Sequence, residues 1–268
     1  MSFTIKAGAS ALLVALAGNA CRSEPAPANL LFISIDTLRA DHLSSYGFAK
    51  ETTPNIDALA AKGARFEDVV SPVPLTLPAH SSMLTGTLPT RHGVHDNLGY
   101  ALSDESTTLA ELLQAQGFAT GAAVSSFVLD ARFNLSQGFQ SYDDDFGAEH
   151  KIGFLNERKG DETTAVALRY LDAHRDDRFF LFVHYYDPHD DYAPPEPFRS
   201  RFEDDPYSGE VAFADAQVGR LVEKLREAIV DPSFSEARHE VFDLHVVELQ
   251  GLKQEGQLND PFPLFDQA

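Results

Sequence analysis

Two segments of the chain are apolar at almost every position. Leu30–Ile35 and Phe179–Tyr185 carry residues that would be apolar on both faces of a β-strand. Strands buried on both faces occur in parallel sheets that are covered by helices on either side. We therefore predict that both segments are central strands of a parallel sheet.

Other segments follow alternating or helical patterns. Arg65–Ser71 alternates between polar and apolar residues and is predicted as a strand, and another strand is expected to begin at Phe118. Thr53 is expected to cap a helix that begins at Pro54. The alternation of strands and helices predicts an α/β fold, a doubly wound, mostly parallel sheet sandwiched by helices. Helical spacing predicts helices at residues 53–63, 78–84, 107–117, 161–175 and 209–229.

The last part of the chain departs from this alternation. Residues 231–268 hold one short apolar run, Val246–Leu249, and no strand that is followed by a glycine and a helix. We expect one domain at 29–230 and an atypical tail at 231–268. The α/β fold is then expected to be incomplete at its carboxyl-terminal end.

The first 28 residues differ again in composition. Lys6 precedes a small and apolar run, Ala7–Gly18, which is too short to span a bilayer but suits a secretory signal. Small residues then lead to Cys21. We expect a signal peptide at 1–20 and a linker at 21–28 that is a candidate for lipidation at Cys21. The alternative is a buried N-terminal helix.

This stretch resembles a bacterial lipoprotein signal, apart from Gly18, where such signals usually have leucine. The resemblance implies an exported bacterial protein, either periplasmic or anchored to a membrane through Cys21. Cys21 is also the only cysteine, so no intramolecular disulfide can form.

The charge of the chain limits its partners. Forty-one acidic residues face 21 basic ones, which gives a formal charge of −20. Such a surface repels nucleic acid and anionic lipids, so neither is an expected partner. An anionic substrate would need a local positive centre, and a bound metal ion is a common way to supply one in an acidic protein.

Three polar segments fall where a parallel sheet collects its ligands, beyond the carboxyl ends of the strands. Asp36 ends the first apolar strand and could hold a hard cation, although strand-end aspartates are more often turn or cap residues. Thr76 stands ahead of Pro78 at a predicted helix start, which favours an anion. Its hydroxyl could attack a bound sulfate or phosphate ester, or it could be a plain helix cap.

Histidines and an amide accompany these residues. His80, His92 and His95 follow Thr76, and Asn97 could donate its amide to an oxyanion. His189 lies in a strand-end turn and could be a metal ligand or the acid that protonates a leaving oxygen. His184, inside the preceding strand, is interpreted as a core histidine, and His95 as part of a loop that satisfies its own polar groups.

Four motifs together give the chain a family resemblance. They are NLLFISIDTLRADHLSSYG, TPNIDALAAKGARFEDVVS, LPAHSSMLTGTLPTRHGV and FVHYYDPHDDY with the helix that follows it. In this order they resemble the sulfatase family, within the alkaline phosphatase superfamily. The resemblance implies an alkaline phosphatase-like sandwich, a divalent metal cation, and hydrolysis of small-molecule or glycan sulfate or phosphate esters through a covalent intermediate. It assigns Asp36 and Thr76 to the metal, Thr76 and His189 to catalysis, and Asn97 and His80 to the substrate.

The sequence also departs from the sulfatase pattern. Sulfatases of the family carry a cysteine or serine that becomes formylglycine where this chain has Thr76, which cannot be converted. Asp36 is followed by Thr37 rather than by a second acid. In its Thr-x-Pro-x-His segment the chain is more similar to nucleotide pyrophosphatase/phosphodiesterases, which use a threonine nucleophile and place an asparagine 21 positions later, as Asn97 is here.

The Asp-His-Gly or Asp-Asn-Gly motif that completes the metal site in the superfamily has no counterpart between Asp231 and Ala268. A cation, Ca²⁺ or Zn²⁺, held by Asp36 and Thr76 with His189 would then be bound weakly. We expect a sulfatase-like hydrolase that has low activity in this form. The alternatives are a phosphodiesterase or phosphonate hydrolase on the same scaffold, and a non-catalytic exported lipoprotein that binds a ligand or partner.

Overall fold

The two continuous apolar segments form neighbouring strands at the centre of the sheet. The structure, a computed structural model, describes residues 29–147, 157–230 and 242–248. Strand β1 (Asn29–Ile35) pairs in parallel with β4 (Phe179–Tyr185), and Leu30 lies opposite Phe180. Both strands have neighbours on either side, so the prediction of two central parallel strands is confirmed.

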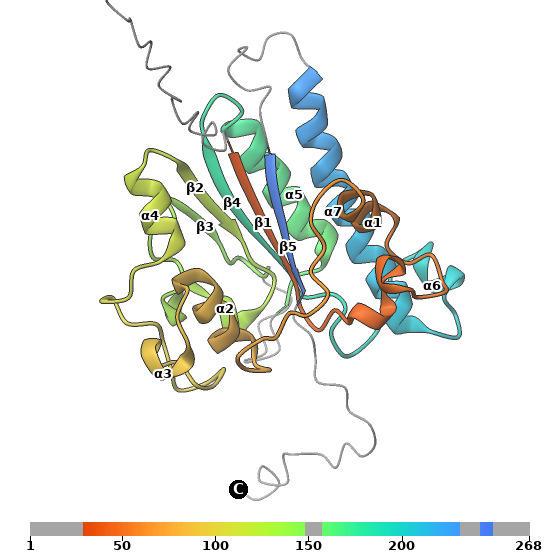
Figure 1. Cartoon of the computed structure of the whole chain (residues 1–268), viewed down its shortest axis with the longest axis horizontal. Coiled ribbons are helices and arrows are strands. Elements are labelled where there is room, and N and C mark those ends of the chain that lie inside the picture. Colours follow the sequence, from red (N-terminus) through yellow and green to blue (C-terminus); the bar gives the residue numbers. More distant parts are fainter. Residues whose placement is uncertain (1–28, 148–156, 231–241, 249–268) are drawn as a thin grey trace, which may run out of the picture.

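In the part of the chain that the structure describes, five strands make up the sheet in the order β3-β2-β4-β1-β5, and all their pairings are parallel. The other three strands are β2 (Ala119–Ala123), β3 (Ser141–Asp143) and β5 (Phe242–Glu248). Figure 1 shows β1 and β5 side by side although they come from opposite ends of the sequence. The chain therefore has the doubly wound α/β architecture predicted from its pattern.

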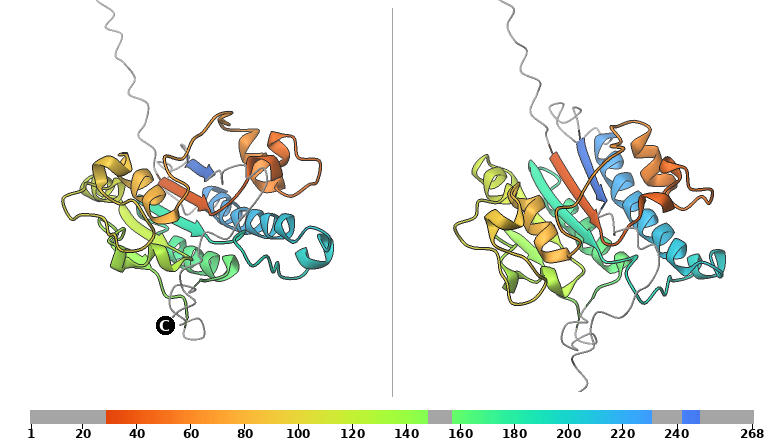
Figure 2. Two further views of the ribbon diagram at one scale, coloured as in Figure 1. Left: turned by 90° about the horizontal axis from the view of Figure 1, so that it is seen from below. Right: turned by 60° about the horizontal axis from the view of Figure 1, so that its bottom comes forward.

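Helices cover both faces of the sheet (Figure 2). One face carries α1 (Pro54–Ala60), α5 (Gly160–Ala173) and α7 (Pro206–Val230). The other carries α2 (Thr76–Thr85) and α4 (Leu109–Ala115). The short elements lie at the periphery: α3 (Pro89–His92), α6 (Phe198–Arg201) and the 3-10 turns Ala40–His42, Ser44–Tyr46, Phe127–Leu129 and Ala131–Phe133.

Alternate residues of β1 belong to two separate hydrophobic cores. Leu31, Ile33 and Ile35 pack beneath α1, α5 and α7. Phe32 points the other way and, with Phe182, packs beneath α2 and α4; the two ring centroids are 5.4 Å apart. Each such side chain gains about 1.5–3 kcal/mol from full burial, so this strand is fixed from both sides.

The predicted strand at Arg65–Ser71 is wrong, because this segment forms no strand. Phe66 is 68% exposed and Val70 is 87% exposed. Alternation stabilises a strand only when one face is buried and a neighbouring strand supplies hydrogen bonds. Within the described residues, no strand lies beside this segment.

The tail contributes a strand to the sheet, which its sequence did not predict. Its residues Phe242–Glu248 form β5 and pair in parallel along the whole of β1, where Glu248 lies opposite Ile35. The run Val246–Leu249 was too short to predict this strand. The predicted signal peptide, linker and most of the predicted tail lie outside the described residues.

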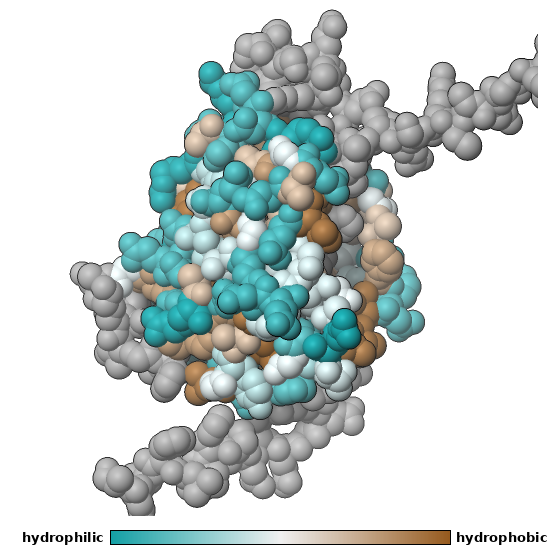
Figure 3. Space-filling view, turned by 90° about the vertical axis from the view of Figure 1, so that its left-hand side faces the viewer, coloured by the Kyte–Doolittle hydropathy of each residue, from teal (hydrophilic) through white to brown (hydrophobic). Residues whose placement is uncertain are grey.

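The outer surface is largely polar. Figure 3 views the α4 side, where hydrophilic residues predominate and hydrophobic ones are scattered among them. This distribution agrees with the acidic composition of the chain. No helix in the described ranges is both long and apolar enough to cross a membrane.

Candidate active site

The carboxyl end of β1 places Asp36 at the edge of the central sheet. Its backbone N–H donates to the carbonyl of Tyr185 at 2.9 Å, and only 4% of the residue is exposed. Thr37 follows with φ of 52°, a left-handed conformation that β-branched residues rarely adopt. The Thr37 hydroxyl donates to the Pro188 carbonyl, and the Tyr207 hydroxyl donates to the Thr37 carbonyl at 2.8 Å. Strained backbone of this kind is concentrated at functional sites.

Thr76 is the first residue of α2, and its hydroxyl donates to Asp36 Oδ2 at 2.9 Å. The next N–H of the helix, on Leu77, donates to Asn97 Oδ1 at 2.9 Å. Because that oxygen is occupied, the amide NH₂ of Asn97 is the group that can donate to an anion. The structure thus brings together three residues that the sequence had assigned to one site, Asp36, Thr76 and Asn97.

His80 lies one helical turn after Thr76 and is fully buried. Its Nδ1 donates to the Thr76 carbonyl at 2.7 Å, so its Nε2 accepts from the Ser34 hydroxyl at 2.7 Å. Burial, reinforced by nearby His184, lowers the pKa of His80 to about 3. His80 is therefore neutral and supports the Thr76 backbone. Both its ring nitrogens are engaged within the protein, and direct contact with a substrate stays a prediction.

His184 belongs to this site, although the sequence suggested a core histidine. It is buried as expected, but its Nε2 lies 3.6 Å from Asp36 Oδ2 and has no hydrogen-bond partner. Its ring meets that of His80 edge-on, with centroids 4.9 Å apart. His184 lies opposite Ser34 in the β1–β4 register, on the α2 side of the sheet. Only the register of two distant strands could have revealed this contact.

The environment of Asp36 keeps its carboxylate charged. Burial, the largest single effect, acts to raise the pKa, but the lowering effects of His184, His80 and His189 together outweigh it. The pKa of Asp36 is therefore below its ordinary value. At neutral pH the Thr76 hydroxyl faces an ionised acceptor.

His189 lies in the turn after β4 and is half-buried. Its ring stacks on Tyr186 with centroids 4.3 Å apart and an angle of 16° between the planes. Its Nδ1 is 3.1 Å from the Asp190 carbonyl. Its positive charge, when present, lowers the pKa of Asp36, so the two side chains act on one another electrostatically.

The remaining polar residues of the segment support its shape. Val94 N–H donates to His92 Nδ1 at 3.1 Å, so His92 Nε2 donates to the Ser82 hydroxyl at 2.9 Å. With this tautomer His92 cannot take a proton from Ser82. Asp96 accepts from the backbone of Asn97 at 2.7 Å, as expected for a loop that satisfies its own polar groups.

The metal ligands available here are few. Asp36 and Thr76 offer a carboxylate and a hydroxyl, whereas Ca²⁺ takes six to eight oxygen ligands and Zn²⁺ usually four ligands. Across residues 29–147, 157–230 and 242–248, no group of three or more histidine, cysteine, aspartate or glutamate side chains is placed to hold a metal ion. The described residues do not make a complete metal centre.

Comparison with solved structures shows the fold. The phosphonate monoester hydrolase of Agrobacterium radiobacter superposes with a TM-score of 0.64 at 18% identity, over 82% of this chain and 61% of that chain. A protein of the alkaline phosphatase superfamily from Vibrio parahaemolyticus gives a TM-score of 0.58 at 19% identity, over 74% and 50% of the two chains. The alkaline phosphatase-like fold is confirmed.

Comparison of sequences identifies the family. Arylsulfatase A of Bos taurus is 43% identical over 116 residues, which are 41% of this chain and 22% of that protein. The chain thus aligns with less than a quarter of the length of such relatives. The family profile described as Sulfatase matches residues 28–234. Since that match covers most of the chain, the protein belongs to the sulfatase family.

Proposed function

We propose that the protein hydrolyses sulfate or phosphate esters with Thr76 as the nucleophile. The hydrogen bond of 2.9 Å from Thr76 to Asp36, at the start of α2, carries this proposal. It joins a hydroxyl to an ionised acceptor at a helix end that favours anions. Asn97 would donate its amide to an oxygen of the bound ester.

The reaction would take place in two steps. Thr76 Oγ attacks the sulfur or phosphorus atom, its proton passes to Asp36, and the bond to the leaving oxygen breaks as His189 protonates that oxygen. Water, which gives a proton to His189, then attacks the same sulfur or phosphorus atom; the bond to Thr76 Oγ breaks, Asp36 returns its proton to that oxygen, and sulfate or phosphate leaves. Both steps occur at the sulfur or phosphorus atom, because threonine cannot release the group through an aldehyde hydrate as formylglycine does.

The family implies a divalent cation, Ca²⁺ or Zn²⁺, and we propose Asp36 and Thr76 as its ligands in this chain. When bound, such an ion stabilises negative charge on the ester and its attacking oxygen. Since the described residues supply only these two ligands in one place, we expect weak binding of the cation and slow turnover by this chain of 268 residues.

A phosphodiester or phosphonate ester is the second candidate substrate. The contact of Asn97 with the residue after Thr76 supports it, since the superfamily branch with a threonine nucleophile has an asparagine at this spacing. The organic part would be a small molecule or a glycan.

The test is a single-turnover experiment that does not require fast catalysis. The chain is mixed with 4-nitrophenyl sulfate or bis(4-nitrophenyl) phosphate, with Ca²⁺, Zn²⁺ or a chelator, and its peptides are analysed by mass spectrometry. We expect a sulfate or phosphate ester on the peptide that carries Thr76. Thr76→Ala should lose this ester, and the control Thr85→Ala, at the other end of α2, should keep it.

Which of the two compounds labels Thr76 decides between a sulfate ester and a phosphate ester as the substrate. If neither compound labels Thr76 under any of the metal conditions, the hydrolase proposal is wrong. Calorimetry with sulfate and phosphate would then show whether the chain is a binding domain, in which case the anion binds but no bond is broken.

A further inference from the structure

We propose that Lys159, Asp187 and Glu210 form an anchor that positions His189 at the candidate active site. The anchor consists of these three side chains and holds the turn of residues 187–193 at both its ends. This proposal rests on the proposed function, because it takes His189 to act in the reaction described above.

The first end of the turn is fixed to α5. Asp187 is 3% exposed, and its Oδ2 accepts from the backbone N–H of Gly160 at 2.8 Å. Its Oδ1 lies 3.5 Å from Lys159 Nζ, just before the same helix. A carboxylate is favoured at a helix start, so Asp187 fixes the exit of β4 onto α5.

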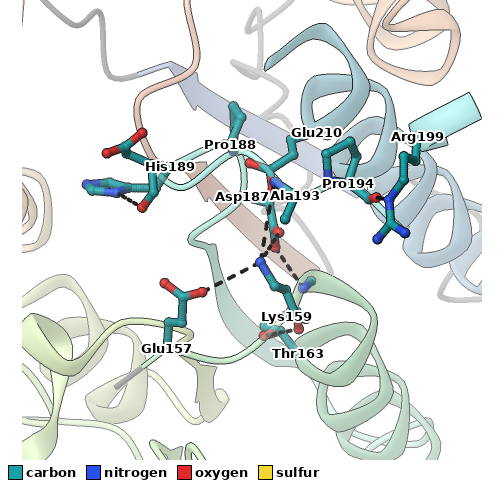
Figure 4. Close-up of polar contacts among 12 residues, drawn as sticks. Glu157, Lys159, Thr163, Asp187, Pro188, His189, Ala193, Pro194, Arg199 and Glu210 are labelled. Carbon is teal, nitrogen blue, oxygen red and sulfur yellow. Dashed lines mark hydrogen bonds and ion pairs between the residues drawn. The ribbon is translucent and has the colours of Figure 1, made fainter. Parts of the chain in front are cut away.

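The second end of the turn is fixed to α7. Glu210 is 1% exposed, and its Oε1 accepts from the backbone N–H of Ala193 at 2.9 Å. The same oxygen is 4.0 Å from Lys159 Nζ, so one ammonium group faces both carboxylates (Figure 4). His189 lies on the stretch between the two attachments, and its ring rests on Tyr186.

Stability alone gives a poor account of this arrangement. Two buried carboxyl groups share one half-exposed ammonium group with a third, less buried one, Glu157, whose Oε1 is 3.5 Å from Lys159 Nζ, and Glu210 Oε2 has no hydrogen-bond partner. Apolar residues of similar size are often as stabilising as buried ions, or more so. The two acidic side chains do, however, determine the path of the turn, because each accepts a backbone N–H at one of its ends. A positioning role explains why both acidic side chains lie here.

Lys159→Met tests the anchor, because it removes the ammonium group and keeps most of the side-chain volume. The matched control is Lys224→Met, since Lys224 of α7 pairs at 2.5 Å with Asp172 of α5, a carboxylate that is 64% exposed. The first readout is the ring chemical shift of His189 in histidine-labelled full chain, assigned with His189→Gln. The second is the single-turnover rate on phenyl and 4-nitrophenyl esters.

We expect Lys159→Met to shift the His189 ring signals and Lys224→Met to leave them in place. The rate on the phenyl ester, which needs protonation of its leaving oxygen, should fall about tenfold or more with little change in half-saturating substrate. Lys159→Arg should restore both readouts in large part. If Lys159→Met does not fold, the charge-balanced variant K159M/E210Q replaces it, since glutamine still accepts from Ala193.

Unchanged His189 signals in the folded variant would overturn the anchor. The same signals separate the two proposals: a shift of His189 in a chain that forms no ester on Thr76 supports the anchor and overturns the hydrolase. Labelling of Thr76 together with unchanged His189 ring signals would support the hydrolase and overturn the anchor.

Discussion

Thr76 and Asp36 are 40 positions apart in the sequence, yet the pattern of the chain was enough to predict that they share a site. Each follows from a local signal, a strand that ends in an acid and a helix that begins at a hydroxyl residue. His184 could not be found in this way, because its role depends on which strand lies beside β1. Nor could the anchor residues, whose contacts join α5, α7 and the turn after β4.

At the residue scale, we expect His189→Gln to affect esters according to their leaving group. An acid contributes most when the leaving oxygen is basic, so phenyl esters should slow about 10²–10⁴-fold and 4-nitrophenyl esters much less. Single-turnover rates on the two esters measure this. Equal losses on both would show that His189 acts on binding or on a metal and not as the acid.

The buried Glu210 predicts a pH dependence of stability. Burial raises its pKa to about 7, so the folded protein holds a proton that the unfolded chain has released. Its contribution to the free energy of unfolding is therefore complete at acidic pH and is lost as the pH rises through about 7, with a slope of at most about 1.4 kcal/mol per pH unit. Urea unfolding between about pH 5 and about pH 8 should show a smaller decrease for Glu210→Gln than for the unchanged chain. Glu223→Gln, at an exposed position of α7, is the control, and equal slopes for all three proteins would contradict the prediction.

At the scale of elements, the prediction of strands succeeded for segments that are buried on both faces. It failed for a segment whose strand conformation would need a neighbouring strand. β1 and β4 are apolar at most positions on both faces, so their place in the sheet follows from composition. Residues 65–71 alternate but have no strand beside them in the described structure. The three residues of β3 are too few for a periodic signal.

The cap of α1 shows the same limit. Thr53 was expected to cap this helix, but its side chain makes no capping hydrogen bond and contacts Asp57 instead. Asp215 of α7 takes that role, because its carboxylate accepts from Asn55 N–H at 3.1 Å and from Ile56 N–H at 2.8 Å. A cap supplied by another helix leaves no mark in the local sequence.

This cap gives a stability prediction. Asp215→Ala leaves two N–H groups of α1 without a partner and should lower the free energy of unfolding by about 0.5–2 kcal/mol. Asp215→Asn keeps one acceptor oxygen, so its free energy of unfolding should lie between those of the unchanged chain and the alanine variant. Urea unfolding at one pH measures all three proteins, and an alanine variant as stable as the unchanged chain would show that water replaces the cap.

At the scale of the whole molecule, the sequence predicted the fold class and the family, while the outermost strand on the β1 side was missed. β5 comes from the tail and depends on pairing with β1 along its full length. Its own apolar run is too short to predict a strand, and the signal lies in a partner that is far away in the sequence.

Export is the prediction that concerns the chain as a whole. We propose that the leader ending at residue 20 is removed and that Cys21 becomes the first residue of the mature protein. Mass spectrometry of the protein isolated from cells should find this terminus, with a lipid on Cys21 if the anchor is present. A chain that still begins at Met1 or Ser2 would refute export by this route.

The strand order also has a consequence for how the protein is made. Asn29 and Phe179, which are joined by a hydrogen bond between β1 and β4, are 150 residues apart. At a synthesis rate of about 5–20 residues per second, β1 waits roughly 8–30 s for its neighbour to be translated. During this time an apolar strand has two unpaired edges, the kind of segment that aggregates or binds chaperones. The pairing of strands that are far apart in the sequence gives the chain a high contact order, which predicts slow folding. The nascent chain would then stay without tertiary structure long enough to be recognised by an export machinery that accepts unfolded polypeptides.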